Sequence, residues 1–554
     1  MKLVYATETG TARAFAEKLW FRLKRAVNGE NLDVVDVAEL GSEWMEASVV
    51  VFIVSTTGEG EVPLAMKPFW NSLLKSSLER DFASGLKFAV FGLGDSNYER
   101  FNAAARKLRA RLVQLGGEEI CKSGAGDDQT DSEMLFDRWT EDVLVPSLGL
   151  TLPANVELDA AKYTVAFEEP SQAATVPGSS RFAVLANRRL TSPTWHQDVR
   201  HLELDTNGVE YHTGDVFHLF PVVPTSLALS VLTSKFPQVD PHSAVKYSPP
   251  HPLLPPKTSV LHCLTRFLDL TAMPSRLFLL QLSFFAQDEE ERDRLREFAD
   301  SSPASASHYL VYCKRERRTI AEVLLDFPSL DLPFARLIEF MPRLKPRAFS
   351  IASSPQVAGA GVLHLTVALL QYLTPNKRMK HGTCSQYIAS LEPGTDVYGY
   401  VTRGALSLPE KATTPLVMVA TGTGCAPMRS LVQGDLGNYR ECTRLYLGHR
   451  SAANDVLYRD WNSPSVKVCM ALSKDNNVRV QQLLARDGEI LYSLLVEQRG
   501  YLFVSGSAKQ MPADVRETLV QQFMKHGRLT NRDDAVKLVR TMEKERRYVV
   551  DAWS

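Results

Sequence analysis

KLVYATETGTA, residues 2–12, decides how the first part of this chain folds. A strand-like run from Lys2 to Ala6 leads into a polar segment with one glycine, and apolar residues recur at helical spacing from Thr11. Hydroxyl and backbone N–H groups at the start of a helix attract anions such as phosphate. The same residue types also make ordinary N-caps. The stretch therefore predicts strand, loop and helix, and its context must decide whether a phosphate binds there.

Further strands and helices alternate through the first 150 residues, which predicts a doubly wound parallel sheet covered by helices. Ligands bind such sheets at the carboxyl ends of the strands. The predicted strands are 3–6, 34–37, 49–55 and 88–92, and the predicted helices include 11–27 and 102–115.

At 554 residues the chain is too long for one hydrophobic core, so several domains are expected. A segment rich in Pro, Ser and Ala, EEPSQAATVPGSS, predicts a linker. Strands of an antiparallel barrel follow, interrupted by a helical insertion, and a second α/β domain ends the chain. We expect domains at 1–150, a linker at 151–180, a barrel at 181–408 with an insertion at about 226–343, and a last domain at 409–554.

The charge and cysteine content exclude several classes of protein. The net charge is −1, and no strongly basic stripe indicates nucleic-acid binding. Residues 1–150 hold 23 Asp and Glu against 17 Lys and Arg, so this part is acidic. The seven cysteines are scattered without a C-x-x-C pair, which argues against a disulfide framework, a structural zinc site or any other metal. No apolar run precedes the first strand, so we expect a cytoplasmic protein without a membrane anchor.

Three more loops follow predicted strands: STTGEG at 55–60, LGDSNYERFN at 93–102 and AGDDQ at 125–129. Together with TETGTA they resemble the FMN-binding face of the flavodoxin family. The resemblance implies a phosphate site at the first loop, a tyrosine against the flavin and an aspartate at its pyrimidine edge. The implied FMN residues are Thr7, Glu8, Thr9, Gly10, Thr11, Ala12, Ser55, Thr56, Thr57, Gly58, Leu93, Gly94, Asp95, Tyr98, Phe101, Asn102 and Asp128.

RAFSIASS at 347–354 resembles the FAD motif of the ferredoxin-reductase superfamily, and HGTCSQYI at 381–388 resembles its second FAD segment. The resemblance implies a cation for the pyrophosphate, an aromatic face for the flavin and a hydroxyl near the flavin N5 atom. A small buried thiol is the plainer interpretation of the cysteine in the second segment. The implied FAD residues are Arg347, Ala348, Phe349, Ser350, His381, Gly382, Thr383, Cys384 and Ser385.

TGTGCAPMRS at 421–430 follows a predicted strand and resembles the NADPH domain of the same superfamily. Two later segments, YLGHRSAANDVLY and ALSKDNNVRVQQLL, hold cations that the resemblance assigns to the 2′-phosphate. At the end of the chain, an acidic residue resembles the group that assists hydride transfer, and a tryptophan resembles the aromatic that covers the flavin. The implied residues are Thr423, Arg450, Ser473, Lys474, Arg479, Gln481, Asp551 and Trp553, with Ser350, Asp551 and Trp553 as the catalytic set.

Two positions depart from the family pattern. Thr57 stands where many diflavin enzymes have an aromatic residue, so one face of FMN would be less fully stacked. Arg479 stands where the family has a tyrosine that stacks on adenine. An arginine can stack on a base in another way.

The motif order of FMN, FAD and NADPH is that of the diflavin reductases, most similar to the cytosolic diflavin oxidoreductases of iron–sulfur protein assembly. The resemblance implies an enzyme that moves electrons from NADPH through FAD and FMN to a one-electron protein acceptor of the anamorsin type. Another acceptor, such as a haem protein, and a scaffold that senses nucleotide without turnover are the alternatives. We expect a monomer.

Overall fold

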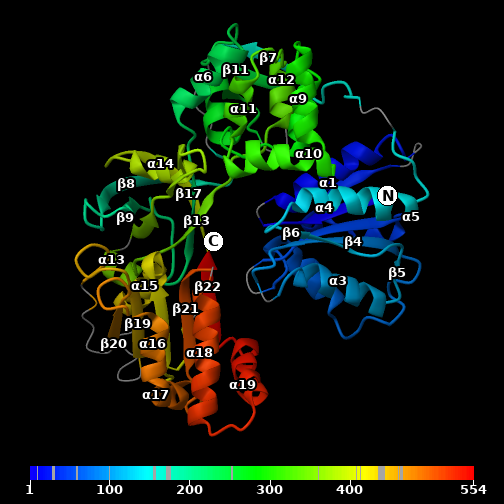
Figure 1. Cartoon of the computed structure of the whole chain (residues 1–554). Helices are drawn as coiled ribbons and strands as arrows, with labels where there is room; N and C mark the ends of the chain where they lie inside the picture. The colour runs from blue at the N-terminus through cyan, green and yellow to red at the C-terminus, as the bar shows by residue number, and fades with distance from the viewer. Residues whose placement is uncertain are drawn as a thin grey trace. The chain divides into compact units, whose positions relative to one another are not determined.

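The computed structural model describes the chain except residues 9, 28–30, 58–59, 99, 154–156, 170–175, 251–253, 360, 407, 412, 435–442, 460, 462–465, 509 and 554. It forms two compact units, whose elements are drawn in Figure 1. Unit 1 consists of Met1–Ala160, Pro274–Lys314 and Ser329–Asp331, and unit 2 of Ala161–Met273, Arg315–Pro328 and Leu332–Ser554. None of the described helices is long and apolar enough to cross a membrane.

Unit 1 contains the predicted parallel sheet, in the strand order β2-β1-β3-β4-β5 with β6 also paired to β4. Its central strands are almost fully buried, because a parallel sheet covered on both faces needs continuous apolar runs. The strands are β1 Lys2–Ala6, β2 Asp33–Asp36, β3 Val50–Ser55, β4 Lys87–Gly94, β5 Glu118–Glu119 and β6 Gly124–Asp127.

Helices cover both faces of this sheet, and alternate residues of each strand contact opposite helices. On one face, Leu3 and Ile53 pack with α1 (Thr11–Leu23) and α4 (Ser132–Trp139). On the other, α2 (Lys67–Leu73) and α3 (Ala103–Gln114) pack against residues such as Val4 and Phe52. Figure 1 shows α1 and α4 on the side opposite α3.

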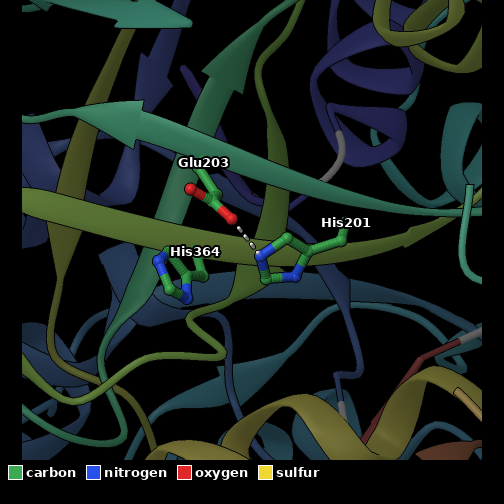
Figure 2. A group of neighbouring side chains, drawn as sticks. All are labelled: His201, Glu203 and His364. Atoms are coloured by element: carbon green, nitrogen blue, oxygen red, sulfur yellow. Dashed lines mark hydrogen bonds and ion pairs between the residues drawn. The ribbon is translucent and has the colours of Figure 1, made fainter. Parts of the chain in front are cut away.

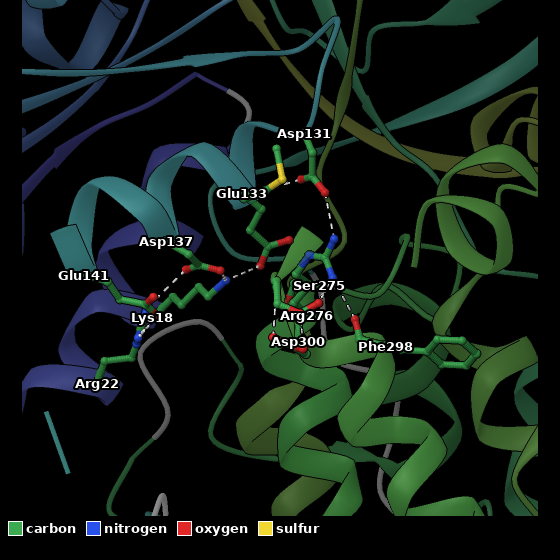
Figure 3. Close-up of polar contacts among 12 residues, drawn as sticks. Lys18, Arg22, Asp131, Glu133, Asp137, Glu141, Ser275, Arg276, Phe298 and Asp300 are labelled. Carbon is green, nitrogen blue, oxygen red and sulfur yellow. Dashed lines mark hydrogen bonds and ion pairs between the residues drawn. The ribbon is translucent and has the colours of Figure 1, made fainter. Parts of the chain in front are cut away.

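Three helices from the predicted insertion belong to unit 1: α8 (Arg276–Ser283), α9 (Glu289–Ala299) and α10 (Pro303–Tyr309). The completely buried Arg276 side chain donates to Asp131 Oδ2 at 2.7 Å and to the carbonyl oxygens of Phe298 and Asp300 at 3.0 and 2.6 Å (Figure 3). Burial opposes ionisation of Asp131, but Arg276 outweighs it and lowers the pKa of this carboxyl. Because Asp131 also caps α4, one ion pair joins the helices to the sheet domain.

Unit 2 begins with the predicted antiparallel barrel, in the strand order β13-β10-β17-β8-β9-β14. A bridge between Ile351 and Leu365 connects the two ends of this order, so the sheet curls back on itself. Buried apolar side chains of β8, β9, β10, β14 and β17 fill its interior, and Phe349 of β13 and the helix α14 (Thr383–Ala389) pack against them. The strands are β8 Ser180–Arg189, β9 Val199–Asp205, β10 Val216–Phe220, β13 Arg347–Ser350, β14 Val362–Ala368 and β17 Asp396–Thr402.

The part of the insertion in unit 2 contains helices and a small sheet that the sequence pattern did not indicate. Its strand β7 (Thr164–Glu168) comes from the segment predicted as a linker and pairs with β11 (Ala244–Ser248). The helices include α6 Thr225–Lys235, α11 Ile320–Asp326 and α12 Phe334–Phe340.

A second parallel sheet ends the chain, in the order β20-β19-β18-β21-β22. It is buried on both faces, as the predicted α/β rhythm requires. Its strands are β18 Leu416–Thr421, β19 Thr443–His449, β20 Val466–Leu472, β21 Tyr501–Ser507 and β22 Tyr548–Trp553, and its helices include α15 Cys425–Gln433, α16 Val480–Arg486, α18 Met511–His526 and α19 Arg532–Lys544.

We predict that Arg276→Ala loosens α8 to α10 from unit 1. The substitution leaves the buried Asp131 carboxylate with only the longer ion pair to Lys314, at 3.9 Å. Removal of one partner from a buried ion pair costs about 3–5 kcal/mol in other proteins. Hydrogen exchange of the α8 and α4 amides should therefore become faster. Arg296→Ala removes an exposed arginine of α9 and should change little. Unchanged protection in Arg276→Ala would show that the pair does not hold these helices.

Candidate flavin and nucleotide sites

The loop between β1 and α1 is tied by its own side chains. The backbone N–H of Gly10 donates to Thr7 Oγ1 at 2.7 Å, and Gly10 has a φ of 91°, which favours glycine. Thr11 is exposed at the first position of α1, and Ala12 is buried beneath it. Glu8 accepts a hydrogen bond from the backbone N–H of Leu64 at 3.0 Å, so it positions the loop. The predicted Thr9 lies outside the described residues.

The loops after β3 and β4 join the first loop at the same edge. Ser55 Oγ donates to the carbonyl of Ala6 at 3.0 Å, and Thr56 N donates to the carbonyl of Leu93 at 2.8 Å. The backbone N–H of Thr57 donates to the carbonyl of Glu61 at 3.0 Å, within the same turn. Gly58 lies outside the described residues. Three loops that the sequence separates by about 40 residues each are therefore held together.

The β4 loop contacts the loop after β6. Asp128 N donates to the Gly94 carbonyl at 2.9 Å, and Gln129 Nε2 donates to Asp95 Oδ1 at 2.9 Å. Asn102 is buried with a φ of 51°, and its amide donates to Gly126. The Asp128 side chain is exposed, whereas Tyr98 and Phe101 are half-buried. The four loops form one face with threonine hydroxyls, an aromatic ring and a carboxylate.

In unit 2, β13 carries the first predicted FAD segment and pairs with β10. Arg347 and Ala348 are exposed, and Phe349 and Ser350 are half-buried. The positive charge of Arg347 acts on Cys384, so the first segment lies near α14. The Arg347 guanidinium is exposed at the start of β13, so it is suited to bind a phosphate group.

The hydroxyl groups of the second predicted FAD segment already form hydrogen bonds within the protein. Thr383 Oγ1 is 2.6 Å from Thr271 Oγ1, and Ser385 Oγ accepts from Leu370 N at 2.8 Å. Burial raises the pKa of the Cys384 thiol to about 12, as expected for a small buried apolar residue. His381 is exposed and Gly382 half-buried. The backbone of this segment is therefore better placed than its side chains to contact a ligand.

Ser350 and Asp551 meet although 201 positions separate them. Ser350 Oγ donates to Asp551 Oδ2 at 3.1 Å. Burial raises the pKa of Asp551, and the Ser350 hydrogen bond partly offsets this effect. Asp551 also lies opposite Ser505 in the β21–β22 pairing, and Trp553 two residues on has 39% of its surface exposed. This contact joins β13, the predicted FAD strand, to β22 of the second parallel sheet. We call this sheet, β18 to β22, the nucleotide sheet.

The glycine loop after β18 packs closely on β21. A Cβ atom at Gly424 would lie 2.2 Å from the Ser505 carbonyl oxygen, so only glycine fits there. Gly422 has a φ of 53° with open space around it, and Thr423 between them is half-buried. The Ser505 side chain is fully buried, and its Oγ has no hydrogen-bond partner among the described residues. Close backbone packing and an unpaired hydroxyl are both suited to a nucleotide approaching this loop.

The predicted 2′-phosphate residues follow two adjacent parallel strands, β19 and β20. Arg450 and Lys474 are exposed, and Lys474 N donates to the Arg450 carbonyl at 2.8 Å. Ser473 Oγ is weakly bonded to the His449 carbonyl at 3.4 Å. Arg479 is exposed at the start of α16, whereas Gln481 is occupied by a hydrogen bond to Asp514 at 2.9 Å. Two cations thus share one edge, and Gln481 is positioned by α18.

His201, Glu203 and His364 form a cluster that the sequence analysis did not single out (Figure 2). Alternation along β9 puts His201 and Glu203 on one face, where His201 Nε2 lies 3.0 Å from Glu203 Oε1. Two guanidinium groups face the cluster: Arg429 Nη1 lies 3.5 Å from His364 Nδ1, and Arg188 Nη2 3.5 Å from Glu203. Their positive charges oppose a metal cation, so we interpret the cluster as a hydrogen-bond network.

Contacts that the sequence analysis did not predict join the barrel to the nucleotide sheet. Arg429 is buried, donates to the Ala352 carbonyl at 2.8 Å and lies 4.4 Å from the centre of the Tyr458 ring. Trp195 and His196 of a barrel loop contact Lys474 and Arg450. No motif signals the contacts of Trp195 and His196, because their partners lie more than 250 residues away in the sequence.

Two family models match this chain: the flavodoxin model over residues 3–139 and the FAD binding domain model over residues 178–387. They confirm the two flavin-binding folds expected from the sequence. Proteins named NADPH-dependent diflavin oxidoreductase 1 from Danio rerio, Schizosaccharomyces pombe and Arabidopsis thaliana are 33%, 31% and 31% identical to it. Each alignment covers 100% of this chain and 99% of the relative. The chain is therefore an oxidoreductase that belongs to the NADPH-dependent diflavin oxidoreductase family.

Proposed function

We propose that this enzyme moves electrons from NADPH through FAD and FMN to a protein that accepts one electron at a time. The hydrogen bond between Ser350 and Asp551 is the observation that carries the proposal. It brings the predicted FAD strand, the C-terminal carboxylate and the neighbouring strand of the nucleotide sheet to one place. A nicotinamide and a flavin need this proximity to react.

The residues present fit the three cofactors. The carboxyl edge of the first sheet would hold FMN, Arg347 and the α14 backbone would hold FAD, and the Gly424 loop with Arg450 and Lys474 would hold NADPH. The tight packing at Gly424 and the unpaired Ser505 hydroxyl support the last assignment. When bound, the two flavins supply the conversion of a two-electron donor into one-electron steps.

Asp551 and Trp553 have separate roles in this proposal. With NADPH bound, the Asp551 carboxylate would stabilise the positive charge that hydride donation leaves on a nicotinamide. Ser350 orients the carboxylate by donating to Oδ2. The partly exposed Trp553 ring would cover a bound flavin and shield it from water, and it would have to move aside for a nicotinamide.

We further propose a cytoplasmic location, a monomer and an anamorsin-type acceptor. The acidity of the first 150 residues supports a basic docking surface on the acceptor. The domain division is proposed as 1–150, 151–180, 181–408 and 409–554. No single contact distinguishes anamorsin from a haem protein, so the acceptor must be tested directly.

The test is release of the bound flavins with chromatography, followed by anaerobic titration with NADPH and then with oxidised anamorsin. We expect one FMN and one FAD per chain, reduction by NADPH and reoxidation by anamorsin. Flavins that NADPH reduces but anamorsin does not reoxidise would support the reductase activity and exclude this acceptor. A chain without FMN would overturn the proposal.

We predict that Asp551→Asn slows flavin reduction by NADPH by at least about tenfold, because the stabilising charge is lost. Stopped-flow absorbance of the FAD would measure this rate. Since burial raises the pKa of Asp551, the rate in the parent should fall on acidification at a pH above the usual value for aspartate, about 3.9. The variant should lack this acid limb.

Stability provides the control for that variant. A raised folded pKa means that burial of Asp551 costs stability once the pH rises through that pKa. Asp551→Asn should therefore keep its FAD and unfold at a temperature equal to or slightly above the parent's at pH 7. A variant as fast as the parent would show that the carboxylate has no part in hydride transfer.

We predict that Trp553→Ala improves the use of NADH relative to NADPH by roughly tenfold in kcat/KM. Without the indole, entry of the nicotinamide no longer requires displacement of a ring. The binding energy of the 2′-phosphate, which NADH lacks, is then less important for the reaction. Trp553→Phe keeps a ring and should retain most of the parent's preference. Steady-state reduction of ferricyanide with each nucleotide measures both variants, and an unchanged ratio in Trp553→Ala would contradict the assignment.

A further inference from the structure

The loop between β8 and β9, residues 190–198, is a fixed structure that reaches the nucleotide sheet. Within the loop, Thr191 Oγ1 donates to the Gln197 carbonyl at 2.8 Å, and Arg189 Nη2 donates to the Trp195 carbonyl at 2.7 Å. Ser192 N donates to the Asn454 carbonyl, beyond β19, at 2.9 Å. The loop therefore holds its two aromatic side chains in defined positions.

Each of these side chains contacts one of the two predicted phosphate-binding cations. Arg450 Nη1 lies 2.9 Å from His196 Nε2, which must accept because a guanidinium can only donate. The Lys474 ammonium lies 4.6 Å from the centre of the Trp195 ring. A barrel loop thus reaches both cations at the edge of the nucleotide sheet.

Trp195 offers an aromatic face where the family segment of this chain lacks one. Arg479 replaces the adenine-stacking tyrosine of that segment. Trp195 is half-buried, and its Nε1 is buried without a hydrogen-bond partner among the described residues, so its ring face is the available group. A base stacks on an aromatic ring more strongly than an exposed ammonium binds to it.

We infer that this barrel loop forms one wall of the site for the 2′-phosphoadenosine end of NADPH. Adenine stacks on the Trp195 ring in place of Lys474, which moves to the 2′-phosphate. His196 holds the Arg450 guanidinium in position for the same phosphate. The inference rests on the proposed function, in which Arg450 and Lys474 bind NADPH.

A neighbouring cavity of about 470 Å³, lined by Val456, Val468 and Met470 among others, is the rival location for adenine. Its lining includes one aromatic side chain, the buried Trp461, and one exposed cation, Arg459, so its aromatic ring offers less open surface than Trp195 does. Met470 is partly exposed there and provides a matched control.

The test measures binding of 2′,5′-ADP to the flavin-loaded enzyme by calorimetry, with kcat/KM for NADPH and NADH. Trp195→Ala should weaken 2′,5′-ADP about tenfold and lower kcat/KM for both nucleotides, whereas Trp195→Tyr should bind nearly as the parent does. His196→Ala should weaken 2′,5′-ADP about fivefold and leave kcat/KM for NADH within about twofold. Met470→Ala should match the parent.

Arg450→Ala separates this inference from the proposed function. If Arg450→Ala weakens 2′,5′-ADP while Trp195→Ala and His196→Ala do not, the phosphate site stands and the loop has no part in it. Weakening by Met470→Ala instead of Trp195→Ala would place adenine in the cavity and overturn the inference. If Arg450→Ala itself binds 2′,5′-ADP normally, the assignment of the phosphate site fails.

Discussion

The contact between Ser350 and Asp551 is the constraint on which the chemistry of unit 2 depends. Ser350 ends a barrel strand and Asp551 lies on the last strand of a separate sheet, so neither domain alone contains the pair. The buried contacts of Arg429 with Ala352 and of Ser430 with Ser353 hold the two domains against each other. They pack the two domains closely together around the 3.1 Å hydrogen bond.

Burial of Asp551 shows why this contact is retained despite its cost. A half-buried carboxylate is harder to ionise than one in water, and a single hydroxyl donor compensates only in part. Asparagine would satisfy the same position with less loss of stability. The fold does not require a negative charge at this point, which agrees with the proposed role of Asp551 in stabilising a positive charge during hydride transfer.

The sequence predicted the sheets, the barrel and the loops well, because their signals are local. Buried strands such as Val50–Ser55 are continuous apolar runs, and the glycines at 10 and 424 mark sharp turns and close packing. The strand Thr164–Glu168 was missed because all five of its residues are partly or fully exposed and its pairing partner lies about 80 residues away. Thr9 and Gly58, to which the resemblance assigns contacts with FMN, lie outside the described residues.

The ion pair of Arg276 with Asp131 illustrates what a pattern of single residues cannot reveal. In the sequence, Arg276 is one more polar residue at the start of an apolar helix. In the fold it is fully buried, and four polar or aromatic groups from distant positions surround it. Burial of an arginine is tolerated only when all these partners are present together. The helices α8 to α10 are therefore bound to the sheet domain by a contact that is specific in geometry as well as in charge, although the chain connects them at both ends to unit 2.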